Sequence, residues 1–247
     1  MVRTVMEAFA RRDAAALHEL QDSEFEFRSV LSGLAGGSYR AGDIERYFAD
    51  VDEQLGDWHT EDETYVEAPD GRIVVLYRGS GRGRQSGVPV DQEMAMLWTL
   101  RGGKLLLAET FLDQVEALRE TRLEALESLR KVNDAISAGD LRAASLLLHP
   151  DVVWEHNLGV GSLEEGVYRG RQAVLELYER IVEPWDYMRP HPDRIRVLED
   201  GSFLLTGRLR AKHATSATVV TAPYEQQLEI RDGLLVHGRM TTGTIDV

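Results

Sequence analysis

The chain has 247 residues, of which 43% are hydrophobic, and its formal net charge is −14 at pH 7. This length suits one large domain or two small ones. The strong negative charge repels nucleic-acid phosphates and anionic membranes, so neither is an expected partner. There is no cysteine, which excludes disulfides and thiol catalysis. The sequence has neither the apolar run of a signal peptide nor one that could cross a membrane, so a cytoplasmic location is expected.

The first half of the chain predicts helices, then a short strand, another helix and three long strands. Asp13 precedes a helical run and is a predicted N-cap. "FEFRS" has the alternation of a short strand, and the segments after Asp70 alternate or run continuously apolar, as long strands do. The last two strands meet at Gly102-Gly103, a two-residue turn that tolerates positive φ.

The second half repeats this plan in the same order. "AISAGDLRAASLLL" resembles the earlier "AFARRDAAALHEL", and "DGSFLLTGRLRAK" resembles "DGRIVVLYRGSGR". Asp140 is the corresponding N-cap, "VVWEH" the short strand, and Asp232-Gly233 the last hairpin turn. Such repetition indicates two copies of one domain.

The boundary between the copies falls near Glu120. The segment "DQVEALRETRLEALESLRKVNDAI" keeps apolar residues at helical spacing, so we expect a helical junction and rigidly coupled copies, 1–119 and 120–247. Asp113 invites a catalytic interpretation. However, Asp113 and Glu116 stand at the spacing of a capping box, which favours helix capping.

Helices packed on one face of a bent antiparallel sheet form an α+β cone. The strings "GGSYRAG", "GRGRQSGVPV", "LWTLRGGK" and "FLDQVEAL" resemble a SnoaL-like domain of the nuclear transport factor 2-like superfamily, and the second copy matches more loosely through "HPDVVWEHN" and "GVYRGRQAV". The resemblance implies two cone domains, each with a pocket between helices and sheet. It also implies pairing through sheets, which the two copies could form as an intrachain pseudo-dimer.

Glu109 is the candidate catalytic residue of the first copy. A regular hairpin with its turn at Gly102-Gly103 pairs Met96 with Glu109 and Trp98 with Leu107. Glu109 would then share the bulky, helix-facing side of the sheet with Met96 and Trp98, the candidate ligand-binding residues. Burial there would raise its pKa and suit a general acid or base. The alternative is a glutamate at the rim of the cone, paired with an arginine.

That predicted register leaves Ala95, Leu97, Thr99, Ala108 and Thr110 on the other, flatter face. Small apolar residues suit contact between sheets, so we expect this face to meet the second copy.

The same construction gives the second copy a more polar pocket. It places Tyr224, Gln226, His237 and Arg239 on one face, and "VVWEH" adds Trp154 and His156. His156 or His237 could be an acid or base near neutral pH, Arg239 could bind an anionic oxygen, and Trp154, Tyr224 and Gln226 could contact the ligand. The alternative is a degenerate copy whose interior is a hydrogen-bonded network.

These features predict a small-molecule enzyme without a cofactor or metal. The resemblance implies proton transfer in an apolar pocket, as in cyclisation, isomerisation, dehydration or epoxide opening. Two alternatives remain: a protein that binds an apolar small molecule without catalysis, and a structural pseudo-dimer with closed cavities.

Overall fold

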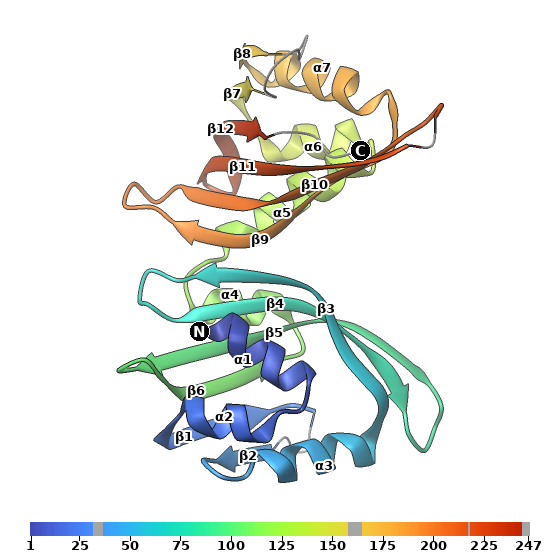
Figure 1. The fold of residues 1–247 in the computed structure, drawn as a ribbon. Coiled ribbons are helices and arrows are strands. Elements are labelled where there is room, and N and C mark those ends of the chain that lie inside the picture. Colours follow the sequence, from blue (N-terminus) through green and yellow to red (C-terminus); the bar gives the residue numbers. More distant parts are fainter. Residues whose placement is uncertain (32–36, 158–164, 217, 244–247) are drawn as a thin grey trace. The chain divides into compact units, whose positions relative to one another are not determined.

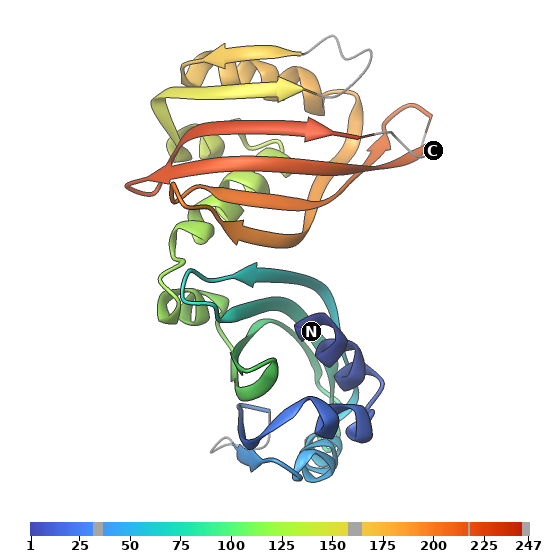
Figure 2. The same cartoon turned by 60° about the vertical axis from the view of Figure 1, so that its left-hand side comes forward.

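The computed structural model describes residues 1–31, 37–157, 165–216 and 218–243. The chain divides into two compact units, Met1–Arg122 and Leu123–Val247. Each unit combines helices with a bent sheet, as the views in Figures 1 and 2 show. The fold is therefore α+β, in two tandem cone domains.

The elements of the first unit follow the predicted order with two additions, a second short strand at Gly37–Arg40 and a fourth strand after the third helix, at Leu55–Glu67. They are α1 (Val2–Ala10), α2 (Ala14–Leu20), β1 (Gln21–Ser29), β2 (Gly37–Arg40), α3 (Ile44–Gln54), β3 (Leu55–Glu67), β4 (Ile73–Gly83), β5 (Pro89–Arg101), β6 (Lys104–Phe111) and α4 (Gln114–Glu120).

The second unit repeats this series from its own first helix onward. Its elements are α5 (Ala125–Ser137), α6 (Leu141–Leu147), β7 (Leu148–Asn157), β8 (Gly166–Arg169), α7 (Arg171–Val182), β9 (Trp185–Val197), β10 (Phe203–His213), β11 (Val219–Arg231) and β12 (Leu234–Thr242).

The two sheets have the same topology. The strand order is β2-β1-β6-β5-β4-β3 in the first unit, and β8-β7-β12-β11-β10-β9 in the second. The first strand of each unit pairs in parallel with the last one, β1 with β6 and β7 with β12, while the other pairs within each unit are antiparallel. This parallel pair sets the short strands at an edge of each sheet, beside the helix that follows them.

Local signals in the sequence set the ends of several elements. The Asp13 carboxylate accepts a hydrogen bond from the Ala16 N–H at 3.1 Å, and Asp140 caps α6 in the same way at 2.9 Å. Asp113 caps α4, which confirms the capping interpretation. The turns at Gly102-Gly103 and Asp232-Gly233 have positive φ at both central residues, as predicted.

The expected helical junction is interrupted. Helix α4 ends at Glu120 and α5 begins at Ala125. Between them Arg122 has φ of +58°, a left-handed conformation that an α-helix cannot contain. The helical spacing was correct on both sides of the boundary, but not across it.

The predicted register of the last hairpin is wrong in both units, for the same reason. A β-bulge follows the turn, so that Trp98 pairs with Ala108, and Glu109 pairs with Leu97. Leu106 is the extra residue, and Val236 is its counterpart in the second unit, where Glu229 pairs with His237. One extra residue turns every later side chain of the strand to the opposite face.

The bulge keeps charged groups out of the core. Leu105 and Ala108 are both fully buried on the helix-facing side of β6 although they are three positions apart. A regular strand could not bury both, and it would have turned the Glu109 carboxylate inward at a high desolvation cost.

The core of the first unit lies between α1, α2, α3 and the concave face of its sheet. Its largest members are aromatic, and Phe9, Phe27, Tyr47 and Trp98 are among them. On the opposite face, helix α4 packs against β4, β5 and β6. Ala95 and Leu97 lie on that face, as predicted, whereas the bulge returns Ala108 to the core.

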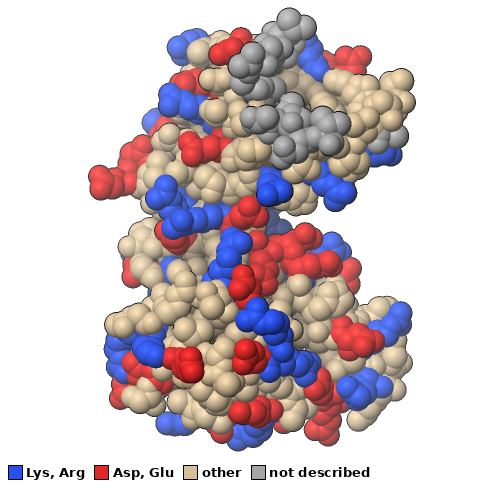
Figure 3. Space-filling model, viewed as in Figure 1, with Lys and Arg blue, Asp and Glu red and all other residues tan. Residues whose placement is uncertain are grey.

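In the view of Figure 3, acidic and basic side chains are mixed over the visible surface of each unit. Among the helices that the structure describes, none combines the length and the apolar character needed to span a bilayer.

Candidate functional site

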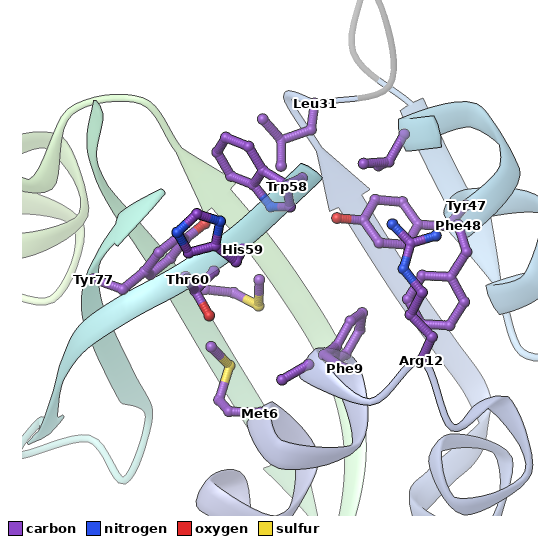
Figure 4. Close-up of a pocket in the computed structure, with 13 residues that line it drawn as sticks. Met6, Phe9, Arg12, Leu31, Tyr47, Phe48, Trp58, His59, Thr60 and Tyr77 are labelled. Carbon is purple, nitrogen blue, oxygen red and sulfur yellow. The ribbon is translucent and has the colours of Figure 1, made fainter. Parts of the chain in front are cut away.

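A cavity of about 130 Å³ lies inside the first unit, between the helices and the concave face of the sheet. Its lining comes from helices α1 and α3, from the segments after α1 and β1, and from strands β3, β4 and β5 (Figure 4). The lining residues are Met6, Phe9, Ala10, Arg12, Leu31, Tyr47, Phe48, Val51, Trp58, His59, Thr60, Tyr77 and Met96.

Most of the cavity wall is apolar and firmly packed. Phe9 of α1 makes edge-on contacts with Tyr47 and Phe48 of α3, at centroid distances of 6.0 and 5.9 Å. It also lies 6.0 Å from the Trp98 ring in the layer below. Aromatic contacts of this kind stabilise beyond area burial, so this side of the cavity is preformed.

Two tyrosines bring hydroxyl groups to this apolar cavity. Tyr77 and Tyr47 are only 2% and 5% exposed. Burial raises the pKa of each phenol above its ordinary value of 10.0, so both are neutral hydrogen-bond donors at physiological pH. Tyr47 hydrogen bonds with Ser29, whereas none of the described residues hydrogen bonds with the Tyr77 hydroxyl.

Two further polar lining residues, Arg12 and Thr60, have partners within the protein. Arg12 forms an ion pair with Asp52, with 2.5 Å between Nη1 and Oδ2, and its guanidinium lies over the Phe48 ring. Thr60 donates a hydrogen bond to Glu63 at 3.2 Å. Arg12 and Thr60 are therefore already paired, and the Tyr77 hydroxyl is the donor that an occupant of the cavity could use.

His59 is an exposed lining residue on β3, where it pairs with Ser80 of β4. Its Nδ1 is 2.9 Å from the Asp57 carbonyl oxygen. Since a carbonyl only accepts, the neutral ring carries its proton on Nδ1, and Nε2 keeps a lone pair. His59 therefore presents a ring nitrogen with a lone pair.

The structure places the predicted residues of the first copy in three different environments. Met96 lies in the cavity wall, and Trp98 lies beneath it in the core. Glu109 lies on the opposite face, where its carboxylate is 2.8 Å from Arg28 Nη1. The side chain of Glu109 is 24% exposed, so the alternative of an arginine-paired glutamate describes its position, and the predicted cavity position is wrong.

The predicted pocket of the second copy is also divided by the bulge. Trp154, His156, Tyr224 and Gln226 are buried on the concave face. His237 and Arg239 lie on the other face, where both contact the Glu155 carboxylate, at 3.1 and 2.7 Å. The structure therefore does not bring all six together.

The buried polar residues of the second unit contact their close neighbours. The Trp154 indole N–H lies 3.4 Å from His156 Nδ1, and the Gln226 amide lies 3.6 Å from the Met240 sulfur. The Tyr224 hydroxyl and the Gln226 Oε1 are enclosed without a hydrogen-bond partner among the described residues. Burial raises the pKa of Tyr224 above 10.0.

Sequence reasoning missed Tyr47, Tyr77 and Trp58. One signal for Trp58 was present: Gly79 and Gly81 alternate within an otherwise regular strand. Glycines in a strand interior mark the close approach of another group, and here that group is the Trp58 indole. The tyrosines carried no comparable signal, because buried tyrosines are common core residues.

Comparison with known proteins gives a family and a fold. The model of the SnoaL-like domain matches residues 2–107 and again 129–238. No curated protein matches the chain.

Similar solved structures each align with about half of the chain. An NTF2-like protein of unknown function from Burkholderia pseudomallei K96243 has 21% identity and a TM-score of 0.42, over 48% of this chain and 90% of its own. An NTF2-like protein from Burkholderia xenovorans LB400 has 15% identity and a TM-score of 0.39, over 49% and 88%. TerC co-crystallised with polyporic acid has 19% identity and a TM-score of 0.42, over 48% and 91%.

The two separate matches to the family model cover most of the chain and fall one in each compact unit. The chain therefore belongs to the SnoaL-like domain family, and it carries two tandem copies of that domain.

Proposed function

We propose that the first unit binds a compact, ring-containing small molecule with one oxygen acceptor, and that Tyr77 donates a hydrogen bond to that oxygen. The observation that carries this proposal is the Tyr77 hydroxyl, which lines an apolar cavity without a partner among the described residues. The hydroxyl faces the cavity, so an occupant with an acceptor there gains the net value of one hydrogen bond, about 0.5 to 1.5 kcal/mol.

The size of the cavity restricts the ligand. A dry apolar cavity of about 150 Å³ accommodates benzene in an engineered protein, and the volume here is about 130 Å³. A single ring therefore fits with the side chains in their present positions. The aromatic walls of Phe9 and Trp58 suit the faces of such a ring.

Acetophenone and ethylbenzene are a matched pair of probes, because they differ in one carbonyl oxygen. Titration of the full chain, followed by NMR or calorimetry, should show binding of both. Tyr77→Phe should weaken acetophenone about tenfold, the loss of a hydrogen bond of about 1 to 1.5 kcal/mol. It should leave ethylbenzene unchanged. Equal effects on both probes would contradict the assigned donor.

Two control variants accompany this test. Tyr187→Phe removes a phenol from strand β9 of the second unit, and Glu109→Gln removes the residue first expected in the cavity. Neither side chain lines the cavity, so both variants should bind acetophenone as the original protein does.

A second candidate function is proton transfer within the same pocket, favoured by the free lone pair of His59 Nε2. In this reaction Nε2 takes a proton from the carbon next to a carbonyl, while the oxygen, which becomes an enolate, accepts a hydrogen bond from Tyr77. Return of the proton to carbon completes an isomerisation or an exchange.

Exchange of the acetophenone methyl protons in D₂O tests this reaction directly. The original protein should accelerate the exchange, and His59→Ala should reduce the acceleration by about 10² to 10⁴-fold, as expected for a general base. Binding of acetophenone by His59→Ala should persist. Binding without any accelerated exchange would leave the first unit as a binding domain.

A further inference from the structure

The Trp58 indole fills the space on the concave face of the first sheet that a side chain at position 79 would occupy. A Cβ atom on Gly79 would lie 2.3 Å from Cη2 and 2.5 Å from Cζ2 of Trp58. Gly81, on the same side of β4, would place a Cβ 3.2 Å from Cε3. The indole therefore rests directly on the backbone of β4, where only glycine leaves room at position 79 and a Cβ at position 81 would be tight.

A side chain at position 79 would move the indole toward the cavity. The sheet backbone lies on one side of the ring, and the Met94 sulfur, 3.3 Å from the same Cβ position, lies beside it. The cavity lies on the side of Trp58 away from the sheet (Figure 4). The depth of the cavity thus depends on how closely Trp58 approaches β4.

The strand itself does not require glycine at this place. Gly79 and Leu209 hold the same position in the ladders of the two units, because Ile73 pairs with Trp98 as Phe203 pairs with Leu228. A leucine is accommodated in β10 within regular pairing. Glycine in β4 is therefore a requirement of the Trp58 position.

We propose that Gly79 is a specificity-determining residue of the first unit, which sets the size of the ligand by fixing the depth of the Trp58 wall. The inference rests on the proposed function only in that the cavity takes up a ligand. It does not depend on which oxygen Tyr77 contacts.

Two probes without oxygen separate size from hydrogen bonding: ethylbenzene, with one ring, and 2-ethylnaphthalene, with two. Gly79→Ala should weaken ethylbenzene at least tenfold, because the displaced indole fills the cavity. Trp58→Leu should bind 2-ethylnaphthalene at least tenfold more tightly than the original protein does. In Gly79→Ala/Trp58→Leu the clash is gone, so ethylbenzene binding should return.

Gly56→Ala is the matched control, since it adds the same methyl group to β3, where the nearest atom is 3.9 Å away. It should bind ethylbenzene normally. The Trp58 indole N–H resonance, assigned by its loss in Trp58→Leu, should shift in Gly79→Ala and stay in place in Gly56→Ala. If Gly79→Ala does not fold, Gly79→Ala/Trp58→Leu still tests the position, because the clash is gone: a folded double variant that binds ethylbenzene supports the role of Gly79, and one that does not fold overturns it.

The outcomes distinguish the two proposals. Normal ethylbenzene binding by Gly79→Ala, or no gain of 2-ethylnaphthalene by Trp58→Leu, overturns the role of Gly79 and leaves Tyr77 unaffected. If the one-ring and two-ring probes behave as expected but Tyr77→Phe has no selective effect on acetophenone, the role of Gly79 is supported and the assignment of Tyr77 as the donor is overturned. If no variant binds any probe, both proposals fail.

Discussion

At the scale of single residues, the two units carry the same surface ion pair with its charges exchanged. Arg28 of β1 pairs with Glu109 of β6 in the first unit, and Glu155 of β7 pairs with Arg239 of β12 in the second. Both pairs lie on the face away from the core, one position along from the buried Phe27 and Trp154. This position of the sheet therefore carries a partly exposed ion pair in both units, and the strand that bears the acidic residue differs between them.

The exchanged pair predicts a dependence on pH in the second unit. Hydrogen bonds from Arg239 and then from His237 lower the pKa of Glu155 below its ordinary value of 4.5. A lowered pKa in the folded state stabilises the fold above the unfolded pKa, and this contribution is lost as the pH falls through the folded pKa.

Glu155→Gln should therefore be less stable than the original protein at pH 7, by up to about 1 kcal/mol for a partly exposed pair. The difference should shrink below pH 4.5, which is the ordinary carboxyl pKa. Thermal unfolding at pH 3, 4, 5 and 7 would measure this. Glu225→Gln, at an exposed position of β11, is the control, and a constant difference at every pH would contradict the assignment.

At the scale of elements, the β-bulge after each hairpin turn decides which face the last strand presents. Its sequence signal is the run of apolar residues from Leu105 to Leu107, which breaks the alternation expected of a half-buried strand. With the bulge, Leu105 and Ala108 face the core, while Glu109 reaches Arg28. A hairpin register counted from the turn alone cannot include the extra residue.

Deletion of Leu106 should restore a regular register and turn Glu109 into the core of the first unit. We expect a loss of stability of at least about 3 kcal/mol, because a buried carboxylate without a partner is costly. Adding Glu109→Met to the deletion should recover part of the loss. Denaturant unfolding measures both variants, and a deletion that is tolerated as well as the deletion of a surface-loop residue would refute this role of the bulge.

At the scale of the whole chain, two copies of one fold have different interiors. The positions of Met94 and Met96 in the first unit correspond to Tyr224 and Gln226 in the second. Tyr77, whose cross-strand partner is Met94, corresponds to Gly207, whose partner is Tyr224. The same region of the cone is thus an apolar cavity with a tyrosine donor in one unit, and an enclosed polar cluster in the other.

This difference predicts one acetophenone site per chain. The lining of the cavity comes entirely from residues of the first unit, while the polar atoms of Tyr224 and Gln226 are enclosed. Calorimetric titration should give a stoichiometry of one, and it should be abolished by substitutions in the first unit only. Two sites of equal affinity would show that the second unit binds the same class of ligand.

Local sequence patterns were enough to predict the repeat, the helix caps, the hairpin turns and most of the element order, although not β2 or β3. These features depend on local properties. Asp13 caps a helix that begins at the next residue, and the turn at Gly102-Gly103 needs only the backbone freedom of its own glycines. Apolar alternation also identified the concave face of β5, where Met96 and Trp98 lie.

Which side chains line the cavity depends on tertiary contacts. Glu109 and His237 lie on the outer faces because one extra residue turns the later side chains of the strand to the opposite face. The high cost of burying charge favours that arrangement. Trp58 and Tyr77 line the same cavity because β3 and β4 are paired strands. The faces and contacts of the site depend on pairings between distant segments, and local sequence patterns constrain those pairings only weakly.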